Sequence, residues 1–133
     1  MKNIYALFTF FLIQTFSFSQ VDVDKIIIEL NSNLKLYSGD SKINKVYLNR
    51  NEKIIDIGEY LIPLENTEII FEKESRVYNG IKIVGYVTFK RETNSINIGK
   101  EYISSVGFAF KSKDGAYKFI DLLFKLKKEL END

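Results

Sequence analysis

The fold is decided by the stretch Val106–Leu130, VGFAFKSKDGAYKFIDLLFKLKKEL, which predicts a strand, a tight polar turn and one long helix. The bulky apolar residues of its first part, Val106, Phe108 and Phe110, alternate with Gly107, Ala109 and Lys111. A period of two is typical of a strand that buries one face. We therefore expect Val106–Lys111 to be a strand whose phenylalanines point into the core.

The second part of this stretch has the pattern of an amphipathic helix. Ser112 or Asp114 can cap it, because a short side-chain oxygen accepts from the free N–H groups of the first turn. Gly115 in the first turn is expected to lower the stability of the helix slightly. Apolar residues then recur at spacings of three and four, with Leu122 and Phe124 widening the stripe: Ala116, Phe119, Ile120, Leu123, Leu126 and Leu130. We interpret the helix as a core element, since a partner-binding or membrane-surface helix would need an exposed apolar face.

The first 19 residues have the pattern of a secretory signal peptide. Lys2 gives a positive start, Ile4–Ile13 is apolar apart from Thr9, and Ser17 and Ser19 are small residues placed for cleavage before Gln20. The apolar run is short for a membrane span, which needs about 20 residues. We expect residues 1–19 to be removed and residues 20–133 to form one domain that is exported, periplasmic or extracellular. The alternative is a domain anchored to the membrane by an uncleaved N-terminal segment.

The composition of the chain limits the compartment-specific stabilisation and the classes of partner that can be expected. The chain has no cysteine, so an exported domain would depend on its core alone, without disulfides. Removing residues 1–19 takes away one lysine from the 19 basic residues and none of the 18 acidic residues. The mature chain is then neutral, which gives no electrostatic argument for nucleic-acid binding. No membrane span is expected after signal removal.

Upstream of the closing strand and helix, the pattern predicts one helix and a series of strands. Val21–Tyr37 has helical spacing, although Asn31, Ser32 and Asn33 are weak helix formers and favour a break. Strand-sized segments follow, and Asn79-Gly80 between two of them is a strong hairpin signal. The expected strands are 45–49, 52–57, 60–64, 67–78, 81–91, 96–98 and 102–111.

These elements predict an α+β fold. Short connections favour a meander of antiparallel strands. We expect a strongly bent antiparallel sheet, or a partly open barrel of about six to seven strands, capped by the C-terminal helix and accompanied by an additional N-terminal helix.

The segment Val106–Leu126 resembles the close of domains of the pleckstrin-homology-like superfold. The resemblance consists of the alternating aromatics of the last strand, the charged turn 111–114, and Ala116, Phe119 and Leu123 on the capping helix. It covers about a fifth of the chain, which lacks the tryptophan of the eukaryotic pattern. The first hairpin loop offers Arg50 with Glu52 beside it, so phosphoinositide binding is not carried over. The resemblance implies a scaffold for binding.

The sequence excludes several classes of catalytic and metal-binding site. Without histidine or cysteine, triad catalysis, thiol chemistry and ordinary zinc sites are excluded. No glycine-rich phosphate loop occurs, and Asp22-Val23-Asp24 lacks the remaining ligands of a calcium loop. Paired carboxylates remain, at Glu72 and Glu74 or at Glu59 and Glu65, and we interpret them as solvated charges. No catalytic, cofactor-binding or metal-ligating residue is therefore assigned, and no cofactor is expected.

Three hypotheses about function stay open. The first is a non-enzymatic binding module that holds a peptide or protein partner by strand addition near Val106–Lys111. The second is a small hydrolase or lyase that depends on carboxylates alone. The third is a structural domain tethered to the membrane. Basic residues flank the Asn79-Gly80 hairpin, interleaved with glutamates, and Tyr78, Tyr86 and Tyr102 could stack on a ligand.

Overall fold

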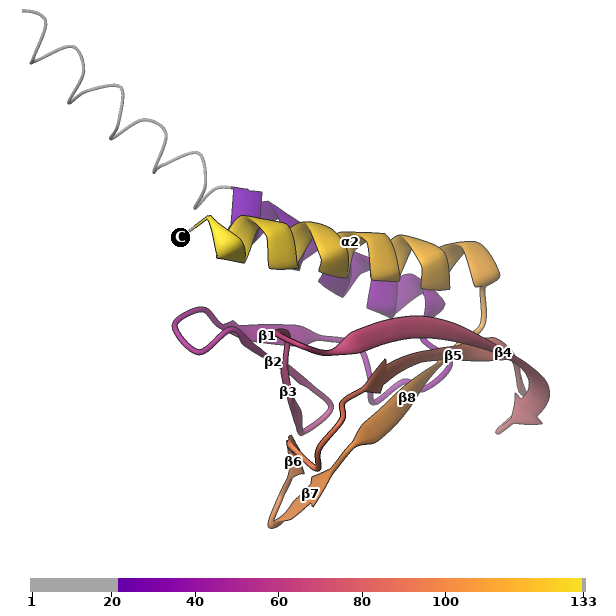
Figure 1. Ribbon diagram of the computed structural model, residues 1–133. Coiled ribbons are helices and arrows are strands. Elements are labelled where there is room, and N and C mark those ends of the chain that lie inside the picture. Colours follow the sequence, from indigo (N-terminus) through magenta and orange to yellow (C-terminus); the bar gives the residue numbers. More distant parts are fainter. Residues whose placement is uncertain (1–21, 133) are drawn as a thin grey trace, which may run out of the picture.

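A computed structural model describes residues 22–132, which form one layer of helices over two antiparallel sheets (Figure 1). The expected signal peptide, Met1–Ser19, lies outside these residues. Within 22–132, no helix combines the length and the apolar character that a membrane crossing requires.

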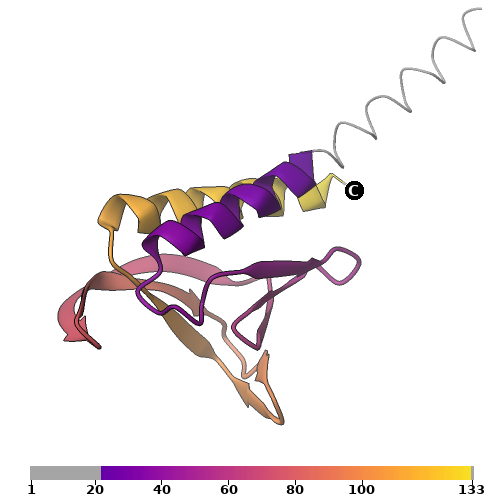
Figure 2. The same cartoon turned by 180° about the vertical axis from the view of Figure 1, so that it is seen from behind.

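The helical layer consists of two antiparallel helices lying side by side (Figures 1 and 2). The N-terminal helix covers residues 22–37 without interruption, and α2 spans Lys113–Glu131. The predicted break at Asn31–Asn33 is therefore wrong, because the side chains of Asn31 and Asn33 form hydrogen bonds with other elements of the fold. Asn33 is buried and its Nδ2 donates to the carbonyl of Gly115 at 3.0 Å, whereas Asn31 Oδ1 accepts from the Val46 N–H at 2.6 Å.

Eight strands are formed within the described residues. A five-stranded sheet has the order β1-β2-β3-β6-β7 and a three-stranded sheet the order β4-β5-β8. Their bounds are β1 (Val46–Asn49), β2 (Ile54–Ile57), β3 (Tyr60–Pro63), β4 (Glu68–Tyr78), β5 (Ile81–Lys90), β6 (Ile96–Ile98), β7 (Glu101–Ile103) and β8 (Ser105–Phe110). All registered pairs are antiparallel, and most consecutive strands are neighbours, as the short connections predicted.

The α+β class and the cap of the C-terminal helix are confirmed, but the two sheets do not close into a barrel. The strand count also exceeds the expected six to seven. The expected last strand, 102–111, is divided at Ser104 into two strands that belong to different sheets. β7 pairs with β6 and β8 pairs with β5, so the chain turns from one sheet into the other at this residue.

The Asn79-Gly80 hairpin forms as predicted. Asn79 and Gly80 have φ values of 50° and 77°, the left-handed pair that a tight hairpin turn requires. The register between β4 and β5 shifts between Lys73 and Arg76, directly after the pair Lys73–Gly85. Residues 72–80 are all exposed, and the end of this hairpin projects from the body of the fold.

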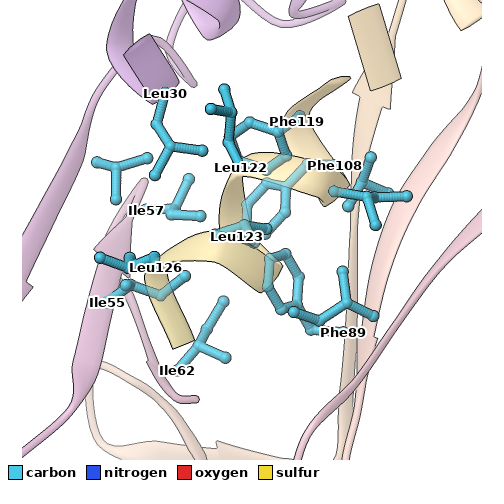
Figure 3. Close-up of a cluster of buried hydrophobic side chains, with 14 of the residues drawn as sticks. Leu30, Ile55, Ile57, Ile62, Phe89, Phe108, Phe119, Leu122, Leu123 and Leu126 are labelled. Carbon is cyan, nitrogen blue, oxygen red and sulfur yellow. The ribbon is translucent and has the colours of Figure 1, made fainter. Parts of the chain in front are cut away.

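The core lies between the two helices and the inner faces of both sheets (Figure 3). Phe108 of β8 stacks edge-on against Phe89 of β5, with ring centroids 5.7 Å apart. α2 contributes its predicted stripe and Ser112 caps its first turn by accepting from the Gly115 N–H. Phe124 was expected to widen the stripe, and this is wrong, because its side chain is 48% exposed. The buried residues of α2 are Gly115, Ala116, Phe119, Ile120, Leu122, Leu123, Leu126 and Leu130.

Candidate functional site

β8 is an edge strand whose outward backbone groups can be assigned from its neighbours. The Gly39 N–H donates to the Ala109 carbonyl at 2.7 Å, and the Lys111 N–H donates to the Tyr37 carbonyl at 2.9 Å. In an antiparallel ladder, backbone groups alternate between the two sides of a strand. The N–H and C=O of Ser105 and Gly107, and the N–H of Ala109, therefore point away from β5. We call these groups the β8 edge.

One end of the β8 edge is occupied by the chain itself. Ser38 forms an isolated antiparallel bridge with Phe110, immediately after the N-terminal helix. This segment occupies the outward groups of β8 from the Ala109 carbonyl onward, and the groups from Ser105 to the Ala109 N–H form the uncovered part. Ser105 and Gly107 are both exposed.

The other three sheet edges carry features that discourage strand addition. β4 has a bulge and exposed charges at Lys73, Glu74 and Arg76, both of which are known to block edge pairing. β7 is only three residues long and begins with Glu101. At β1, the Val46 N–H donates to Asn31 of the N-terminal helix. By contrast, β8 has neither a charged residue nor a register shift.

A cavity of about 250 Å³ adjoins the β8 edge. Its walls combine residues from four strands, β3, β4, β5 and β8, and the segment after the N-terminal helix. They include Gly107 and Ala109 of β8, Gly39, Arg76 of β4 and Tyr86 of β5. We call this hollow the β8 cavity. It brings backbone hydrogen-bonding groups, aromatic surface and one cation to the same place.

Arg76 is the cation of the β8 cavity. Its Nη1 donates to the Tyr86 hydroxyl at 3.4 Å, which is a long hydrogen bond. This hydrogen bond is the main cause that raises the pKa of Arg76 above the ordinary arginine value. Asp40 also lines the cavity, and its Oδ1 accepts from the backbone N–H of Lys42 at 3.0 Å in its own loop.

The remaining basic residues of the hairpin are distributed differently from Arg76. Lys90 forms an ion pair with Glu72 at 3.1 Å. Arg91 ties two loops together, because its Nη1 donates to Thr67 Oγ1 and to the Glu65 carbonyl, and its Nε donates to Ser95 Oγ. Lys90 and Arg91 are therefore engaged with partners inside the fold and are not free to form a basic surface for an anionic partner.

Of the three tyrosines singled out from the sequence, two reach the site. Tyr78 and Tyr86 line the β8 cavity, together with Tyr60 of β3. Tyr60 also stacks edge-on against Phe108. Tyr102 lies on β7, where it is exposed and does not line this cavity.

The candidate carboxylates do not form an acid–base pair in a buried site. Glu65 lines a second cavity of about 520 Å³ with Glu68 and Glu131, but its side chain is 68% exposed and forms an ion pair with Lys53 at 3.1 Å. Glu59 lies in the turn between β2 and β3, outside that cavity. All of these side chains are exposed to water.

In the described part of the chain, no three side chains of His, Cys, Asp or Glu come together as a group that could hold a metal ion. Asp22 and Asp24 are exposed residues in the first turns of the N-terminal helix, where we expected a helix start. Comparisons with models of protein families, with curated proteins and with solved structures find no match for this chain. The site is therefore interpreted from its own geometry.

Sequence reasoning found the β8 strand but not the cavity beside it. Arg76, Gly39 and Tyr60 lie on separate segments, and no local pattern indicates that they meet. The alternation of Val106–Phe110 located the strand itself. It gave no sign that the strand lies at an edge, because edge strands usually carry a charge or a proline.

Proposed function

We propose that this protein is an exported, non-enzymatic binding module that holds an extended peptide as an additional strand on the β8 edge. Export rests on the signal-peptide pattern of residues 1–19. The mode of binding rests on the uncovered backbone groups of Ser105 and Gly107. Strand addition derives affinity from main-chain hydrogen bonds and specificity from pockets for alternate side chains.

The single observation that carries the proposal is the contrast between β8 and the other edges. An uncharged, regular edge strand invites pairing with another chain, so proteins usually protect such strands. β8 is unprotected from Ser105 to the Ala109 N–H, and a cavity adjoins it. The scaffold implied by the resemblance to pleckstrin-homology-like domains, with a last strand followed by a capping helix, agrees with this use.

A substitution at Gly107 tests the proposal. Proline removes the outward N–H and leaves the hydrogen bonds to β5 in place, because proline is tolerated where the missing N–H faces solvent. We expect Gly107→Pro to weaken binding of peptides selected from a random hexapeptide library on the purified protein by about tenfold, through loss of a hydrogen bond and obstruction of the edge.

Gly107→Ala is the matched control. Its Cβ would lie 3.2 Å from Thr88 Oγ1 and 3.4 Å from Tyr86 Cβ, as the proline Cβ also would, but the N–H is kept. We expect the alanine variant to bind as the wild type does, with both variants folded by circular dichroism. Equal affinity of the wild type and Gly107→Pro would show that the peptide does not lie on the β8 edge.

A further inference from the structure

We infer that the β8 edge receives the C-terminal end of its partner, which lies parallel to β8 and places its free carboxylate beside Arg76. This inference rests on the proposed function and specifies the chemistry and the direction of the peptide. Three observations on the described residues support it.

The first observation is that an added strand must stop at the segment Ser38–Gly39. The Ala109 carbonyl already accepts from Gly39, and Lys111 already donates to Tyr37. A peptide that pairs with Ser105 and Gly107 therefore meets occupied backbone groups after a few residues. A chain that ends at this point can keep its pairing with β8 up to its last residue, whereas a longer chain would have to turn away from the sheet.

The second observation is the cation at the blocked end. Arg76 lines the same cavity as Gly39 and Ala109, and is held by a long hydrogen bond to Tyr86. A guanidinium can donate two parallel hydrogen bonds to one carboxylate. Asp40, the acidic residue in the lining, uses one carboxylate oxygen to accept from the Lys42 N–H of its own loop.

The third observation fixes the direction. β8 runs from Ser105 to Phe110, and its Phe110 end is the blocked one. A parallel peptide brings its C-terminal carboxylate to that end, next to Arg76. An antiparallel peptide would bring its N-terminal ammonium there, and two positive charges would face each other.

The test compares the free acid and the C-terminal amide of the tightest hexapeptide selected from a library with free C-termini. We expect amidation to weaken binding to the wild-type protein by about tenfold, as for the loss of one charge-assisted hydrogen-bonded pair. Arg76→Gln should weaken the free acid by a similar factor and leave the affinity of the amide unchanged, because the two changes remove the same interaction.

Lys82→Gln is the control, since Lys82 is an exposed residue of the same hairpin that does not line the cavity. Its affinities for both peptides should match those of the wild type. Equal binding of acid and amide would overturn the inference and leave strand addition standing. The selected peptide can also carry an acidic side chain. If Arg76→Gln stops weakening binding when that side chain is removed, but still weakens binding of the amide, Arg76 contacts the side chain. The inference is then overturned, and strand addition again stands.

Two further outcomes would contradict the inference in other ways. If neither that library nor a second hexapeptide library with amidated C-termini yields a peptide that binds, the proposed function fails together with the inference. If the purified protein is a dimer that Gly107→Pro converts to a monomer, the occupant is a second copy of this chain, and the inference about a C-terminal carboxylate is wrong.

Discussion

Replacing Phe119 by alanine is expected to lower the free energy of unfolding by about 3–5 kcal/mol, the cost of removing a fully buried aromatic ring. Phe119 is fully buried, and its ring lies 5.4 Å from that of Phe110 at 45°. The substitution therefore removes a ring contact between the capping helix α2 and β8. Unfolding in urea, followed by circular dichroism, measures the loss.

Lys118→Ala is the control for this prediction. Lys118 precedes Phe119 on α2 and is exposed, so its truncation should change the free energy of unfolding by less than about 0.5 kcal/mol. If the two variants unfold at the same urea concentration, α2 does not pack on the sheets through the face that contains Phe119.

Replacing Gly115 by alanine is expected to destabilise the protein, although alanine is the better helix former. A Cβ at Gly115 would lie 2.4 Å from Tyr37 Cγ and 2.7 Å from Tyr37 Cβ, atoms that are close to the backbone and cannot swing aside. Overpacking of this kind costs about 1–3 kcal/mol. It would also disturb the hydrogen bond from Asn33 to the Gly115 carbonyl.

The destabilisation by Gly115→Ala should disappear or change sign when Tyr37 is truncated. In a Tyr37→Ala background the new methyl group has room, and the higher helix propensity of alanine should make Gly115→Ala neutral or stabilising by up to about 1 kcal/mol. A double-mutant cycle in urea isolates this coupling. Equal effects of Gly115→Ala in both backgrounds would contradict the close contact between the helices.

Local patterns were sufficient for most elements of this fold. The period of two in Val106–Phe110 and the period near 3.6 in α2 each follow from which side chains are buried, so both were predicted. Asn79-Gly80 fixed its hairpin because both residues tolerate positive φ. These signals are contained within a few residues of each other, and long-range packing reinforces them.

The features that the sequence did not reveal depend on contacts between distant segments. Gly115 looked like a weak point of a helix until Tyr37, which lies 78 positions earlier in the chain, was seen to fill the space above it. Asn31 and Asn33 looked like helix breakers because their hydrogen-bond partners, the Val46 N–H and the Gly115 carbonyl, belong to other elements. The division of the last strand at Ser104 arises because its two halves pair with different strands.

For the same reason, only one part of the candidate site could be predicted from the sequence. The strand that carries the β8 edge was identified from its own residues. Its blocked end depends on Gly39, and its cation depends on Arg76, which a bulge separates from the regular part of β4. Neither the block nor the charge can be inferred from β8 alone, although both determine what the edge could accept.

Amide hydrogen exchange at Gly107, measured residue by residue by NMR in the unliganded monomer, tests the open β8 edge most directly. The amides of Val106 and Phe108 point to β5 and should exchange slowly, whereas the Gly107 amide between them should exchange at close to the rate of an unprotected chain. Addition of a bound peptide should then slow exchange at Gly107. A Gly107 amide as protected as its two neighbours in the free monomer would contradict the account.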